Sequence, residues 1–101
     1  MKDKSYLKDK EKKHYLGIIL IGLGSSWYQG DNIGKVATKA AKLARQDWKH
    51  LFKLKNHVFT VNIYDITELG DDGEWCLDYQ SGMRNTKTNK EIKLLKMVYA
   101  V

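Results

Sequence analysis

The sequence has one cysteine, no proline and only two arginines among 18 basic residues, and the shortages of cysteine and of arginine narrow the class of protein. Cys76 has no second cysteine with which to form a disulfide in the chain, which excludes a small disulfide-stapled secreted scaffold and favours a reducing, cytoplasmic location. Arg, more than Lys, suits bidentate contacts with phosphates and base edges. A surface with 16 lysines therefore favours electrostatic binding without sequence preference.

Long apolar runs are also missing. The longest, residues 16–23, is far shorter than the ~20 residues that span a bilayer, so no membrane partner is predicted. The run could be the apolar region of a signal peptide, with Gly24 and Ser26 at the small positions before a cleavage point, but three acids in the long leading segment argue against this. Its isoleucines and flanking glycines predict instead a central strand, buried on both faces.

The length of 101 residues, with 43% hydrophobic residues and a net charge of +6, fits one globular domain. Residues 1–13 contain six lysines and few large apolar groups, which predicts a flexible basic arm. Residues 14–101 are predicted to form a single α+β domain.

The clearest element is a helix over about residues 32–54, with Asp31 or Asn32 as its N-cap. At 100° per residue, its apolar side chains fall on one stripe, which is predicted to face the core: Ile33, Val36, Ala37, Ala40, Leu43, Ala44, Trp48 and Leu51. Its basic side chains fall on the opposite face, and we call them the basic ridge: Lys35, Lys39, Lys42, Arg45, Lys49 and Lys53.

Alternating apolar residues predict strands over residues 57–67 and 74–80, joined as a hairpin through the turn-forming pair Asp72 and Gly73. Residues 24–31 are predicted to be a turn region, residues 81–89 a polar loop, and residues 91–101 to contain a last strand. The order β-α-β-β-β predicts an α+β fold, in which one long amphipathic basic helix lies on one face of a small, mainly antiparallel sheet.

A single helix covers little of such a sheet. The strands near residues 16–23 and 97–101 are apolar on both sides, so the second sheet face needs cover from the N-terminal arm or from another subunit. We therefore predict a homo-oligomer, most simply a symmetric dimer.

Motifs for catalysis, cofactors and metals are not recognised. Gly22 and Gly24 begin like a dinucleotide-binding turn, but Trp27 stands where a third glycine is needed. The acidic residues near the predicted hairpin turn match no calcium loop, and the three histidines and Cys76 lack zinc-type spacing. We predict no cofactor, no metal and a non-enzymatic protein.

The charges are segregated along the chain: residues 32–55 carry a net +6, whereas residues 56–82 carry −6 and contain no Lys or Arg. Two aromatic residues, Trp27 and Tyr28, precede the basic helix, and bases of single-stranded nucleic acid stack on such rings. We predict nucleic-acid binding by the basic ridge together with Trp27 and Tyr28. Two alternatives stay open. Trp27 could be a lid on one end of the core. The protein could instead be a protein-interaction module that homo-oligomerises, in which residues 56–82, the acidic segment, contact a basic partner or the basic ridge.

The helix entry Gly30-Asp31-Asn32-Ile33, with Val36 and Ala40 on the inner face, is similar to the Gly-Asp-Thr-Leu helix entry of HicB antitoxins. In those proteins a strand pair precedes the helix, which is usually acidic. This helix is basic, so we carry over no toxin-neutralising function.

Overall fold

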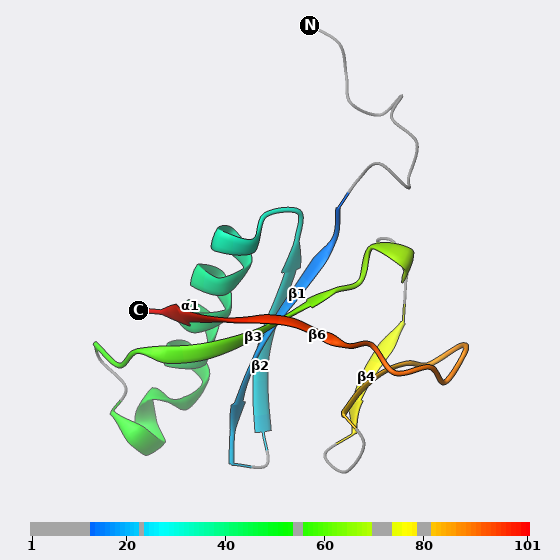
Figure 1. Cartoon of the computed structure of the whole chain (residues 1–101). Helices are drawn as coiled ribbons and strands as arrows, with labels where there is room; N and C mark the ends of the chain where they lie inside the picture. The colour runs from blue at the N-terminus through cyan, green and yellow to red at the C-terminus, as the bar shows by residue number, and fades with distance from the viewer. Residues whose placement is uncertain (1–12, 23, 54–55, 70–73, 79–81) are drawn as a thin grey trace, which may run out of the picture.

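The computed structural model describes residues 13–22, 24–53, 56–69, 74–78 and 82–101. The elements are β1 (Tyr15–Ile21), β2 (Gly24–Gly30), α1 (Ile33–Phe52), β3 (Phe59–Asp65), the short 3-10 helix η3 (Thr67–Leu69), β4 (Trp75–Asp78), β5 (Gly82–Asn85) and β6 (Leu94–Ala100). Four strands form an antiparallel sheet in the order β2-β1-β3-β6, and β4 and β5 form a second, two-stranded sheet (Figure 1). The predicted α+β class is confirmed.

Strand β1 lies at the centre of the larger sheet, between β2 and β3. Ile19 belongs to the core under α1, whereas Leu16 and Ile18 belong to a second apolar cluster. All three side chains are buried. The predicted central strand with two buried faces is therefore confirmed.

Helix α1 begins after Asn32, whose side chain accepts a hydrogen bond from the Lys35 N–H at 3.0 Å, as an N-cap does. Small side chains let it approach the sheet closely. The apolar stripe is confirmed by its fully buried members, which pack on Val61 and Ile63 of β3: Val36, Ala37, Ala40 and Ala44. Ile33 and Trp48 pack at the margin of this core.

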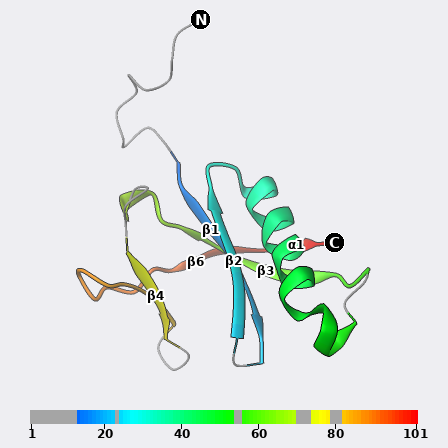
Figure 2. The same ribbon diagram turned by 180° about the vertical axis from the view of Figure 1, so that it is seen from behind.

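The sheet face opposite α1 is partly covered by this chain itself. Met83 of β5 is buried against Leu16 and Ile18, and Trp75 and Leu77 of β4 pack around it. Both views place α1 and β4 on opposite sides of β1 (Figures 1 and 2). The cover that the sequence assigned to the arm or to a second subunit is thus supplied in part by the β4–β5 pair.

Three local predictions were wrong. Residues 24–30 form strand β2 rather than a turn, because they pair with β1 along its whole length, from Tyr15 opposite Gly30 to Ile21 opposite Gly24. β3 does not form a hairpin with β4, since β1 and β6 occupy both of its edges. β4 pairs instead with β5, which lies inside the predicted loop.

The strand predicted near the end of the chain is confirmed as β6, and it pairs with β3. Of the predicted arm only residue 13 is described, and the Asp72–Gly73 turn lies outside the described residues. Within the described chain, no helix has the length and apolarity needed to cross a membrane.

Candidate nucleic-acid interface

The exposed face of α1 carries lysines at regular helical intervals. Lys35, Lys42 and Lys49 are seven residues apart and so recur along one side of the helix, and Lys53 is the C-cap residue that follows the last turn. We call these four residues the lysine line. All four are exposed, and no described residue forms a hydrogen bond or ion pair with their ammonium groups. At 1.5 Å per residue the lysine line extends over roughly 27 Å.

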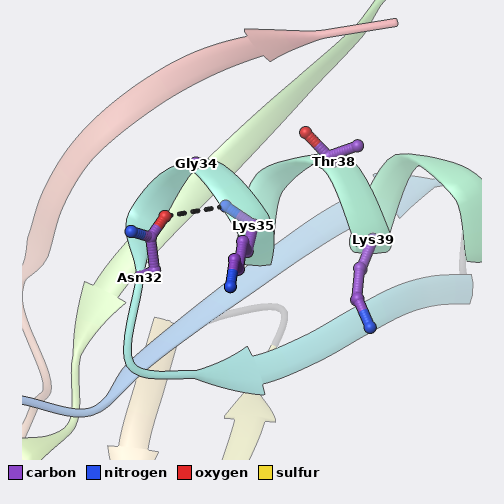
Figure 3. Close-up of a pocket in the computed structure, with 5 residues that line it drawn as sticks. All are labelled: Asn32, Gly34, Lys35, Thr38 and Lys39. Carbon is purple, nitrogen blue, oxygen red and sulfur yellow. Dashed lines mark hydrogen bonds between the residues drawn. The ribbon is translucent and has the colours of Figure 1, made fainter.

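Lys39 leans toward strand β2. Its ammonium lies 5.1 Å from the centroid of the Tyr28 ring, within the range of a cation–π contact. Figure 3 shows Lys35 and Lys39 both directed toward β2, whereas Thr38 points away from that strand. The structure therefore brings together Lys39 and Tyr28, two of the residues predicted for the site.

Arg45 lies toward β3 and already has partners. Its guanidinium donates a hydrogen bond to the His57 carbonyl and lies 5.2 Å from the centroid of the Phe59 ring. These contacts hold the Arg45 guanidinium against the chain segment that enters β3. Arg45 therefore has fewer free hydrogen-bond donors for a phosphate than the lysines of the lysine line have.

Trp27 is not near the basic ridge. On β2 its neighbour Ser26 faces α1, so Trp27, one residue further along, points to the opposite face of the sheet. There it meets Trp75 edge to face, with ring centroids 4.9 Å apart and planes at 88°. Trp27 is 45% exposed, so it is only a partial cover for the second apolar cluster.

A shallow pocket lies at the start of α1, and sequence reasoning missed three of its residues. Asn32, Gly34 and Thr38 line it together with Lys35 and Lys39. These residues are three or four positions apart from each other or from the two lysines. This spacing places them on one side of the helix and could have indicated the pocket. The first turn of α1 contains no acidic residue, so no carboxylate of that turn opposes the lysines.

Helix α1 carries one acidic residue, Asp47, and Asp31 lies just before it, whereas the described acidic residues of segment 56–82 lie on other elements. Asp65 and Glu68 are at the end of β3 and in η3, and Glu74 and Asp78 flank or end β4. Burial alone would raise the pKa of Asp65, but the side-chain and backbone hydrogen bonds from Thr67, together with the charge of Lys13, lower that pKa below its usual value. The described residues contain no group of three or more His, Cys, Asp or Glu side chains that could hold a metal ion.

The arrangement is a one-sided array of positive charge, flanked by a Tyr ring, on a rigid helix. It has the chemistry to bind anions spread over a long surface. No family model, curated protein or solved structure matches this chain.

Proposed function

We propose that the protein is a non-enzymatic, cytoplasmic nucleic-acid-binding protein that uses the lysine line and Lys39 to bind backbone phosphates without sequence preference. The observation that carries the proposal is the lysine line itself: three exposed lysines on one side of α1 and a fourth at its C-cap. Lys presents a compact point charge, which suits phosphates better than base edges.

The dimensions agree with such a role. Phosphates of one duplex strand are spaced 3.4 Å apart along the axis, so a line of roughly 27 Å extends over about eight base pairs. The acidic residues on β4 and around η3 lie on the other side of β1, which orients an approaching polyanion toward α1.

Salt dependence provides the test. Each phosphate neutralised in duplex DNA adds about 0.9 to the slope of log affinity against log salt, and about 0.7 in a single strand. The triple variant Lys35→Gln, Lys42→Gln, Lys49→Gln should lower that slope by about 2.7 on a duplex. Fluorescence anisotropy with labelled double- and single-stranded DNA and RNA of one length, over a salt series, measures it.

The chain offers a matched control with the same loss of charge. Lys87, Lys90 and Lys93 are exposed and lie between β5 and β6, away from α1. Their triple Gln variant should keep the slope of the unmodified protein. Equal losses in both triples, or no binding by micromolar protein at about 50 mM salt, would refute the proposal, because a phosphate-binding surface must act most strongly at low salt.

The second candidate is a protein-interaction module that homo-oligomerises. The favouring observation is the apolar surface of β6, where five of the seven strand residues are exposed. Strand β4, with its described acidic residue Asp78, lies on the side of β1 away from α1, so contact between this strand and the basic ridge would arise between copies.

A further inference from the structure

Strand β6 is an edge of the larger sheet. In the order β2-β1-β3-β6 it pairs with β3 alone, and no other described strand pairs with its outer side. Edge strands expose unpaired N–H and C=O groups, and proteins usually protect them with charges, prolines, bulges or a covering segment.

The side chains of β6 provide little such protection. Lys96 is its single charged residue, and it contains no proline. Four apolar side chains of β6 are exposed, with exposed fractions of 46% for Leu94, 47% for Leu95, 62% for Met97 and 78% for Tyr99. Val101, which follows the strand, is 70% exposed. The opposite edge, β2, has Gly, Ser or Gln at five of its seven positions.

The regular part of β6 is its last five residues. A register shift interrupts the ladder with β3 between Ile63 and Tyr64, whereas Lys96 to Ala100 pair without interruption with Ile63 to Phe59. Met97 and Tyr99 lie on the sheet face away from α1, because the alternate residues Val98 and Ala100 pack in the core under α1.

We infer that β6 pairs antiparallel with β6 of a second copy about a two-fold axis at Val98, which joins the two sheets into one continuous sheet. In this register Met97 lies opposite Tyr99, Leu95 lies opposite Val101, and Lys96 lies opposite Ala100 of the other copy. Apolar residues therefore meet apolar residues, and the Met97 sulfur meets an aromatic ring, which is a favourable pair.

The charges exclude a register whose axis is shifted by two residues, to Lys96. An axis at Lys96 would place two like charges directly opposite each other, which destabilises a strand pair. The axis at Val98 keeps the two lysines several residues apart. A two-fold contact also closes both exposed edges at once, so a second copy fits better than an unrelated strand.

The available area agrees with a weak dimer. With about 200 Å² for a large side chain, the exposed parts of Leu95, Met97, Tyr99 and Val101 amount to on the order of 500 Å² per copy. Two copies then reach about 1,000 Å², the lower end for a specific interface, with ladder hydrogen bonds in addition. We expect dissociation in the micromolar range.

Disulfide trapping tests the register. In a Cys76→Ser background, Val98→Cys places two thiols directly opposite, where Cα atoms of antiparallel pairs are about 4.5–5.5 Å apart, as a disulfide requires. In a glutathione redox buffer this variant should form a covalent dimer. The matched variant Lys96→Cys should not, because its Cα atoms would lie more than about 7 Å apart. Equal cross-linking of both variants would overturn the register.

Sedimentation equilibrium from about 5 to 500 µM tests the dimer itself, since a weak standard interface dissociates in this range. Tyr99→Lys should weaken it at least tenfold, whereas Leu20→Lys, at a position 46% exposed on β1 and separated from β6 by β3, should leave it unchanged. Circular dichroism checks that both variants are folded. A single-copy mass at every concentration, or a dimer insensitive to Tyr99→Lys, would overturn the inference without touching the nucleic-acid proposal.

Discussion

The Trp48 indole N–H donates a hydrogen bond to the Ser26 hydroxyl at 3.2 Å, and this contact ties the second half of α1 to the edge strand β2. The same hydroxyl donates to a carboxylate oxygen of Asp47 at 3.1 Å, and Ser26 is only 3% exposed. One serine on a strand thus serves two consecutive helix residues. The position of α1, and with it the lysine line, depends in part on this small polar contact.

Ser26→Ala should lower the free energy of unfolding by about 1–3 kcal/mol, because it removes both hydrogen bonds at a buried site. Ser25→Ala is the control, since Ser25 is the preceding residue and points away from α1. Urea unfolding of the two variants measures the difference. Equal stability of both variants would show that Ser26 does not hold α1 on β2.

Gly17→Ala should destabilise the protein by about 1–3 kcal/mol through overpacking. A Cβ atom at this position of β1 would lie 2.6 Å from Val36 Cγ1 and 3.2 Å from Val61 Cγ1, so the Val36 side chain of α1 would have to shift and that of Val61 would have to give slightly. The control is Gly22→Asn, where φ is +58° and no heavy atom lies within 4 Å of the added Cβ. Asn tolerates this left-handed conformation, so the control should change stability by less than about 1 kcal/mol. A thermally unperturbed Gly17→Ala variant would contradict the close packing of α1 on β1.

Trp27→Ala separates the two aromatic roles that the sequence left open. Because Trp27 is half exposed and contacts Trp75, we expect a loss of about 1–3 kcal/mol of stability, below that of a fully buried aromatic residue. A double-mutant cycle with Trp75→Ala should give a coupling of about 0.5–1.5 kcal/mol. The salt slope of DNA binding should not change, since Trp27 lies on the face away from α1. Weaker single-strand binding at unchanged stability would instead identify Trp27 as a stacking surface.

Local signals in the sequence were sufficient for α1 and β1. The 3.6-residue period placed Val36, Ala40 and Ala44 in the core, and the pair Asp31 and Asn32 marked the start of the helix, where Asn32 is the N-cap. The isoleucines of residues 18–21 indicated a strand, and this prediction did not require knowing which strands pair with it. Each of these features depends on residues close together in the chain.

Pairing between distant segments could not be predicted in the same way. β2 contains Gly and Ser residues with little intrinsic strand preference, and it is a strand because β1 pairs with it at every residue. Because alternate strand residues face opposite ways, this single difference moved Trp27 away from the basic ridge while it kept Tyr28 beside Lys39. The predicted β3–β4 hairpin failed because turn residues indicate a reversal but do not specify which strands pair.

The last prediction concerns acid stability and the Asp65 carboxylate. Hydrogen bonds from the Thr67 N–H, at 3.0 Å, and from the Thr67 hydroxyl, with the charge of Lys13, outweigh burial and hold its pKa below the ordinary value of 3.8. A carboxyl group with a lower pKa in the folded state stabilises the fold above its unfolded pKa, and this contribution is lost as the pH falls through the folded value. The stability gap between the unmodified protein and Asp65→Asn should therefore be constant near neutral pH and shrink below about pH 4.

Urea midpoints of both proteins at successive pH values from about 6 to 3 measure this gap. Carbon-13 NMR titration of the Asp65 carboxyl group gives the folded pKa directly, and it should lie below that of an aspartate in an unstructured peptide. A gap that widens in acid would have the wrong sign for a lowered pKa. In that case burial, rather than the two hydrogen bonds from Thr67, would control the ionisation of Asp65.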